Sequence, residues 1–177
     1  MSEKETIDKV REKQSLMSKL QDILMFGKGT REDLKELDKQ LRGDYHGSLL
    51  DQRHRWAAAY RETLEAEQAS LGKRFKTVIQ SYDRVMAQVN RASYGYAPLF
   101  HRTGQVESAE LARAFNHDRD IGEYLDRIGE AADAVSQSVM ASDWRSASEG
   151  VDKVREMLDE FERKWKNREK AFRSGEV

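Results

Sequence analysis

The sequence predicts an all-α protein, an elongated antiparallel helical bundle of coiled-coil-like character. Apolar residues recur at helical spacing along most of the chain, and no segment shows the alternation of a strand. The composition agrees, because 36% of the 177 residues are charged and only one is proline, as is typical of elongated helical proteins. The expected organisation is one domain, 1–177, with an N-terminal helix pair (1–43), a long central helix (48–92), an aromatic and basic loop (93–107) and a C-terminal helical hairpin (108–174).

The N-terminal part of the chain predicts two short helices. Ser2 and Glu5 have the spacing of a capping box at the start of the first helix. Thr30 is placed to cap the second helix after a glycine-containing break. Gly43 stands where a glycine commonly ends a helix, so residues 44–48 are expected to form a short link.

The central segment carries the longest apolar stripe and predicts one long helix. Its members lie three, four or seven residues apart, as in a heptad pattern. Arg53 and Glu67 or Gln68 occupy the seam positions that the stripe skips, and Gly72 predicts a kink at most. The stripe comprises Leu49, Trp56, Tyr60, Leu64, Leu71, Phe75, Val78, Tyr82, Val85 and Val89.

Two further stripes predict the C-terminal hairpin. Ser108 is placed to start a short helix to about Phe115, Asp120 to cap the next helix, and residues 141–143 to connect the hairpin tightly. This hairpin and the central helix would form a three-helix core with the N-terminal pair alongside. The stripes are Ile121, Leu125, Ile128, Ala132, Val135 and Val139, followed by Trp144, Ala147, Val151, Val154, Leu158, Phe161, Trp165 and Phe172.

Composition limits the cellular setting. The chain has no cysteine, which excludes disulfides and zinc–thiolate sites, and its net charge is −1. The charged N-terminus lacks the apolar region of a signal peptide, and the longest apolar run, residues 23–26, is too short to cross a bilayer. We therefore expect a cytoplasmic protein.

No pattern of catalytic or metal-binding residues stands out. Asp51 and His54 match half of a di-iron motif once, with aspartate in place of glutamate. His117, Asp120 and Glu123 share a face only if a helix already runs there. Neither a nucleophile elbow nor a complete phosphate loop is present. The sequence thus predicts no enzyme activity, cofactor or metal, with a carboxylate-lined bundle site as the enzymatic alternative.

The loop at 90–104 is the first candidate binding site. Tyrosine and arginine are common in protein interfaces, and aromatic residues beside arginines also stack on nucleic-acid bases. The competing interpretation is a lid over the end of the bundle, with Gly95 and Pro98 shaping the turn. The partner-binding candidates are Arg91, Tyr94, Tyr96, Phe100, His101 and Arg102.

The C-terminal basic run is the second candidate. Residues 162–173 carry six basic and two acidic side chains, a pattern that suits an anionic surface but also an ordinary solvated helix end. The acidic helix near 118–133 is expected to pair with the more basic central helix. The anion-binding candidates are Arg163, Lys164, Lys166, Arg168, Lys170 and Arg173.

The function expected from the sequence is that of a non-enzymatic structural or adaptor subunit, with a protein partner or self-association. The apolar stripes offer more surface than three helices need to bury, and an unburied remainder would mark an interface. The alternative is a nucleic-acid-associated subunit that uses the 91–102 loop and the basic helix patches, including Lys73, Arg74 and Lys76. A membrane surface is a weaker partner candidate, and no small-molecule substrate is evident.

Overall fold

The described part of the protein is almost entirely helical. The computed structural model describes residues 31–91 and 108–174, and the side chains of 35–91 and 116–168. The helices are α2 (Arg31–Glu65), α3 (Ala69–Arg91), α4 (Ser108–Met140) and α5 (Trp144–Ser174), and no strand occurs in these ranges. The all-α prediction is confirmed for this part, while the first predicted N-terminal helix and the 93–107 loop lie outside it.

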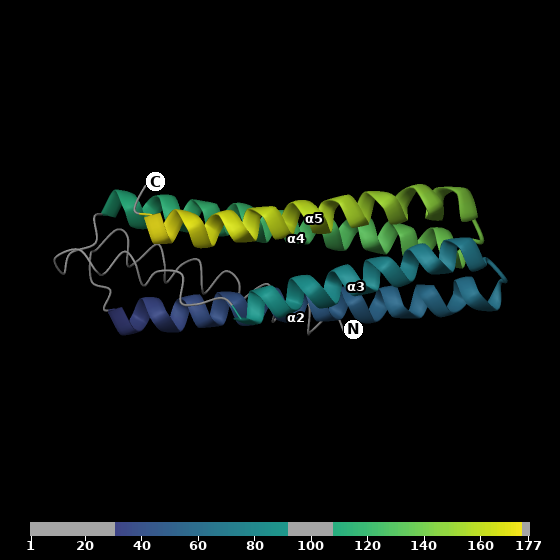
Figure 1. Ribbon diagram of the computed structural model, residues 1–177, viewed down its shortest axis with the longest axis horizontal. Coiled ribbons are helices and arrows are strands. Elements are labelled where there is room, and N and C mark those ends of the chain that lie inside the picture. Colours follow the sequence, from purple (N-terminus) through teal and green to yellow (C-terminus); the bar gives the residue numbers. More distant parts are fainter. Residues whose placement is uncertain (1–30, 92–107, 175–177) are drawn as a thin grey trace.

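The four helices pack as two antiparallel hairpins (Figure 1). Within the first hairpin, Trp56 Nε1 of α2 donates to the Phe75 carbonyl of α3 at 3.2 Å. Between the hairpins, α2 lies beside α4 and α3 beside α5. An ion pair of 2.8 Å between Arg84 and Asp159 marks the second of these contacts.

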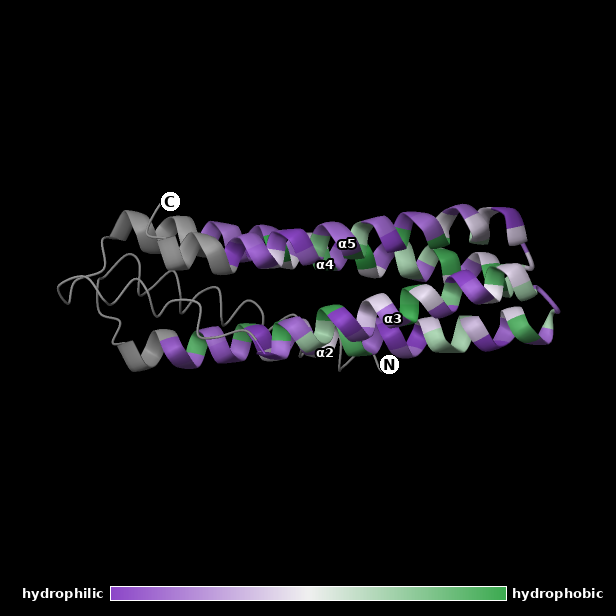
Figure 2. Ribbon diagram, in the orientation of Figure 1, coloured by the Kyte–Doolittle hydropathy of each residue, from purple (hydrophilic) through white to green (hydrophobic). Residues whose placement is uncertain are grey.

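The core fills the space between the four helices (Figure 2). Two sets of buried positions, one in each hairpin, match one another in order. Each member of the first set is separated from its counterpart in the second by the same number of residues as Tyr45 from Ile121. The two hairpins therefore use the same helical period to face one another. The first set is Tyr45, Leu49, Gln52, Trp56, Ala59, Thr63, Leu71, Phe75, Val78, Tyr82, Val85 and Val89; the second is Ile121, Leu125, Ile128, Ala132, Val135, Val139, Ala147, Val151, Val154, Leu158, Phe161 and Trp165.

The predicted helix end at Gly43 and link at 44–48 are wrong, because α2 continues through both Gly43 and Gly47. Leu41, Tyr45 and Leu49 are buried at successive helical positions across this stretch. Burying three large side chains stabilises far more than the roughly 1 kcal/mol that a glycine costs in a helix. Tertiary packing therefore overrides the local glycine signal.

Replacing Gly43 and Gly47 with alanine is expected to stabilise the protein by about 0.5–1 kcal/mol each. A Cβ atom added at either position meets nothing within 4 Å, so the gain in helix propensity is unopposed. Urea unfolding of the single and double variants measures the effect. A loss of stability in Gly43→Ala would instead indicate the left-handed conformation of a helix end at that residue.

The predicted continuous central helix is also wrong, because a turn at 66–68 separates α2 from α3. The amide of Gln68 donates to the Thr63 carbonyl at 2.9 Å, and Glu67 adopts a left-handed φ of 57°. Glutamate is unusual at a position that favours glycine, so the sequence carries no signal for this turn. Glu67 and Gln68 thus form the turn rather than a seam.

Within the described residues, the C-terminal hairpin differs from the prediction only at its start. Helix α4 runs without interruption from Ser108 past Asp120, so the predicted cap at Asp120 is wrong. The connection at 141–143 is confirmed, and it repeats the turn of the first hairpin. There Asp143 caps α5 by accepting a hydrogen bond of 3.1 Å from the Ser146 amide.

Candidate functional site

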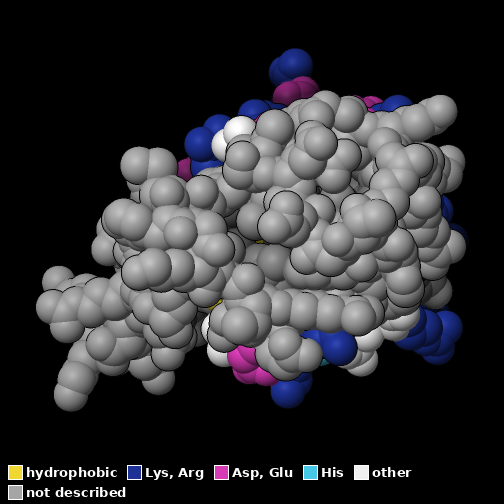
Figure 3. Space-filling view, turned by 90° about the vertical axis from the view of Figure 1, so that its left-hand side faces the viewer, with side chains coloured by type: hydrophobic (Ala, Val, Ile, Leu, Met, Phe, Trp, Pro, Cys, Tyr) yellow, Lys and Arg dark blue, Asp and Glu magenta, His cyan; other side chains and the backbone are white. Residues whose placement is uncertain are grey.

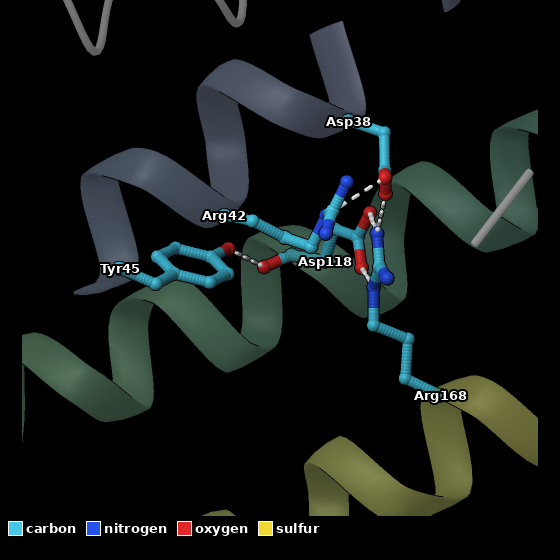
Figure 4. A network of polar contacts seen from close by, with 5 residues as sticks. All are labelled: Asp38, Arg42, Tyr45, Asp118 and Arg168. Atoms are coloured by element: carbon cyan, nitrogen blue, oxygen red, sulfur yellow. Dashed lines mark hydrogen bonds and ion pairs between the residues drawn. The ribbon is translucent and has the colours of Figure 1, made fainter. Parts of the chain in front are cut away.

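Three charged side chains from three helices meet inside the bundle (Figure 4). Asp38 of α2 and Arg168 of α5 are fully buried, and Asp118 of α4 is 2% exposed. Each lies one helical turn from a core residue: Asp38 from Leu41, Arg168 from Trp165 and Asp118 from Ile121. The helical period that buries those neighbours therefore also buries the charges. We refer to Asp38, Asp118 and Arg168 as the buried charge cluster.

Arg168 holds both carboxylates of the cluster. Its Nε lies 2.5 Å and its Nη2 3.0 Å from the two carboxylate oxygens of Asp118, and Nη2 also lies 2.7 Å from Asp38 Oδ1. Arg42 contributes a second guanidinium, with Nε 2.9 Å from Asp38 Oδ2. Two carboxylates and two guanidinium groups balance one another, which offsets the high cost of removing each charge from water.

Aromatic side chains enclose the cluster. The Tyr45 hydroxyl donates a hydrogen bond of 2.5 Å to the Asp118 carbonyl, and the Tyr45 ring meets Trp165 edge-on at 6.1 Å. The Arg168 guanidinium carbon lies 4.9 Å from the centroid of the Trp165 ring, within cation–π distance. Burial, together with the nearby Asp118 carboxylate, raises the pKa of the Tyr45 hydroxyl well above its ordinary value, so this group remains a donor.

The buried charge cluster links three helices through ion pairs. A carboxylate that acts as a general base needs access to a substrate proton, whereas Asp38 and Asp118 are buried and bonded to guanidinium groups. Across 35–91 and 116–168, no group of three His, Cys, Asp or Glu side chains is placed to hold a metal ion. The arrangement ties α2, α4 and α5 together at one level of the bundle.

A second buried polar layer lies further along the core. Gln52 Nε2 donates to the Leu125 carbonyl at 3.3 Å, and the Tyr82 hydroxyl donates to Gln52 Oε1 at the same distance. This layer joins α2, α3 and α4, and burial raises the pKa of the Tyr82 hydroxyl. Gln52, rather than the predicted Arg53, thus fills the seam position between Leu49 and Trp56.

The structure reassigns one of the predicted anion-binding residues. Arg168 faces the core and not solvent, so it cannot serve at a surface. Arg163 and Lys164 pair with Glu160, and Lys166 pairs with Glu162 at 2.5 Å. The side chains of Lys170 and Arg173 lie outside the described residues. Anion binding by the remaining surface residues stays a prediction.

The predicted partner-binding loop is described only at its edge. Arg91 ends α3 and is exposed, whereas Tyr94, Tyr96, Phe100, His101 and Arg102 lie outside the described residues. Figure 3 shows the molecule from the end where α2 and α4 begin, and charged side chains stand out at the rim among those that are described. The binding role of the loop also stays a prediction.

The two hairpins meet through pairs of opposite charge. Arg55 of α2 lies 3.3 Å from Asp133 of α4, as the predicted attraction between the acidic and basic helices requires. Between α3 and α5, Arg74 contacts Asp152, and Arg84 contacts both Asp159 and Glu162. In each of these pairs the first hairpin supplies the cation and the second supplies the anion. This arrangement favours packing of the first hairpin on the second over packing of two first hairpins on one another.

Replacing Glu162 with glutamine is expected to lower stability by about 1–2 kcal/mol at pH 7. Burial would raise the pKa of the Glu162 carboxyl, but hydrogen bonds from Gln88, Lys166 and Arg84 outweigh it and lower the pKa from 4.5 to about 2. A group with a lowered folded-state pKa stabilises above its unfolded value and loses that contribution as the pH falls toward the folded one.

The measurement is urea unfolding at several pH values, with exposed Glu156→Gln as the control. The difference between wild type and Glu162→Gln should shrink between about pH 4.5 and pH 2. A difference that is constant over this range would argue against the ionised contacts.

Sequence reasoning missed Asp38 and Asp118, although a signal for them was present. Both fall at seam positions of apolar stripes, as does Arg168, and opposite charges at such positions on different helices indicate a buried pair. No protein-family model matches this chain, and neither the curated proteins nor the solved structures show a significant match to it.

Proposed function

We propose that this chain is a non-enzymatic structural or adaptor subunit that mediates protein–protein interaction or assembly through its helical surfaces. The observation that supports the proposal is the buried charge cluster of Asp38, Asp118 and Arg168, whose charged groups bind one another inside the bundle. In some proteins, buried charges of this kind specify how helices pack, and we assign the cluster that role here. What such a bundle offers to other molecules is its outer surface.

The contacts between the two hairpins support this role. The ion pairs from Arg55, Arg74 and Arg84 join the two hairpins along both of their shared edges. A surface held in one shape loses less entropy on binding than a surface that must first become ordered. The bundle therefore suits a subunit that presents fixed positions to a partner.

The apolar stripes support a narrower version of the proposal than the sequence suggested. Trp56, Phe75, Phe161 and Trp165 are each at most 1% exposed, because a fourth helix covers the surface that three helices would have left open. Tyr60 and Trp144 are partly buried. A partner would therefore meet polar helix faces, a loop or an end of the bundle, and not an open core.

The alternative function, association with nucleic acid, has weaker support in the helices. Arg74 of the predicted basic patch hydrogen-bonds to Ser148 and pairs with Asp152. Lys73 and Lys76 remain exposed. Few exposed cations at this patch favour a protein partner over a polyanion, whose binding depends on many phosphate contacts.

Gentle affinity isolation of the tagged chain from its source cells, followed by reconstitution from purified components, tests the proposal. We expect one protein partner in a fixed molar ratio with the chain. Nucleic acid recovered without a protein partner, and lost steeply as salt rises, would favour the alternative. A chain that returns alone and has a monomeric mass in solution would contradict the adaptor function.

A further inference from the structure

Two large apolar side chains are exposed within the described residues, and both lie at the same end of the bundle. Leu64, next to the last residue of α2, is 48% exposed, and Met140, the last residue of α4, is 83% exposed. The Arg55–Asp133 ion pair places these two residues of the parallel helices α2 and α4 at about the same height along the bundle. At about 1.5 Å per residue, Leu64 and Met140 lie about 13 Å and about 10 Å beyond that pair, so they reach similar heights.

Three exposed carboxylates accompany Leu64. Glu62, Glu65 and Glu67 are all exposed and form no ion pair with another described residue, unlike the acidic groups between the hairpins. The last turn of α2 also has no basic residue, although a helix end of this polarity favours cations. We call Glu62, Leu64, Glu65, Glu67 and Met140 the hairpin tip.

The backbone at the hairpin tip carries strain that a glycine would relieve. Glu67 has a φ of 57° and Ser142, in the matching turn of the second hairpin, has a φ of 56°. Side chains with a Cβ atom disfavour this left-handed region. Retaining a charged side chain at such a position breaks a local rule, and such exceptions occur most often where a side chain has a use.

We propose that the hairpin tip docks a basic, apolar segment of a partner protein, such as an amphipathic helix with lysines or arginines beside its apolar face. The inference rests on the proposed adaptor function and names its site and the chemistry of its partner. Leu64 and Met140 would exclude water against the apolar face, while the three glutamates pair with the cations. Contact between the glutamates of two copies would oppose like charges, so these three side chains suit a basic partner better than a second copy.

Fluorescence anisotropy with a labelled amphipathic helix tests the docking chemistry. The probe is a peptide of leucine and lysine only, about four helical turns long, and a leucine and glutamate peptide of the same pattern is its control. We expect saturable binding of the basic probe that weakens with salt, and no binding of the acidic one. The absence of saturable binding of the basic probe to the wild-type protein would overturn the proposal.

Substitutions then locate the binding. The pair Leu64→Ser and Met140→Ser, and separately the triple change of Glu62, Glu65 and Glu67 to glutamine, should each weaken the basic probe at least tenfold. The matched control removes three exposed carboxylates elsewhere by changing Glu123, Glu130 and Glu156 to glutamine. It alters net charge equally and should leave binding within about twofold. Equal weakening by the control would reduce the effect to general charge attraction and overturn the proposal.

The fold of each variant is checked by thermal melting, since exposed positions should tolerate these changes.

The docking proposal and the adaptor function can each fail without the other. A protein partner that remains bound to the tip variants would refute docking at the tip and leave the adaptor function standing. A wild-type chain without any protein partner would refute the adaptor function whatever the probe does. Self-association that the serine variants abolish would assign the tip to a second copy and overturn the proposal.

Discussion

Replacing Arg168 with alanine is expected to lower the free energy of unfolding by about 3–5 kcal/mol. The substitution leaves Asp38 and Asp118, both almost fully buried, without the guanidinium that lies within 3.0 Å of each. Asp38 would keep Arg42, but both buried carboxylates would lose the counter-charge that they share, which is costly where water does not reach them. Urea unfolding monitored by helical circular dichroism at pH 7 measures the loss.

The control is Arg163→Ala, which removes an exposed arginine from the same helix and should change stability by less than about 0.5 kcal/mol. A loss below about 1 kcal/mol at pH 7 would mean that Arg168 is not buried between the carboxylates.

Replacing Trp56 with alanine is expected to cost about 3–5 kcal/mol. Trp56 is fully buried, its ring lies 4.7 Å from that of Phe75, and its indole N–H donates to the Phe75 carbonyl. The alanine would leave a cavity between α2 and α3 and an acceptor without its donor. Urea unfolding measures the loss, and Met140→Ala at an exposed position is the control.

A double-mutant cycle between Trp56 and Phe75 makes this prediction specific to the fold. Coupling of about 0.5–3 kcal/mol is expected for rings in contact. In a continuous helix over 48–92 the two residues would lie about 28 Å apart and could not couple. A coupling of zero would therefore restore the single long helix and contradict the hairpin turn at 66–68.

The stripes of the C-terminal hairpin predicted its core correctly. All positions from Ile121 to Val139 in the first stripe are buried, as are Ala147 to Trp165 in the second. Strong periodicity over many turns leaves one face for the core, and each stripe lies within a single helix. Periodicity therefore predicted both helices, and the tight connection at 141–143 followed from the gap between them.

Helix ends could not be predicted where packing outweighs local preference. Gly43 and Gly47 lie inside α2, and Glu67 forms a turn without glycine or proline. The energies of these local signals are about 1 kcal/mol, whereas each large side chain buried in the core is worth about 1.5–3 kcal/mol. The turn at Glu67 folds α3 back onto α2 and brings Phe75 into contact with Trp56. Local sequence preferences do not predict this contact.

The candidate site was predictable only in part. The sequence singled out Arg168, but as a member of a surface run, because a basic residue near a helix end ordinarily faces solvent. Its burial depends on Asp38, which lies in another helix and forms its contact across 130 positions of sequence. Such a pairing follows from the relative placement of helices, which apolar periodicity alone does not supply.

The most direct test of the account replaces the buried charge cluster with apolar residues. A variant with Asp38→Leu, Asp118→Leu and Arg168→Met keeps similar volumes, and exchanges of this kind are often neutral or stabilising by about 1–4 kcal/mol. Its stability and its partner recovery are measured beside the wild type. The account predicts a folded protein, at least as stable, that binds the same partner. A folded variant that has lost the partner would contradict it, because the cluster would then belong to the function and not only to the fold.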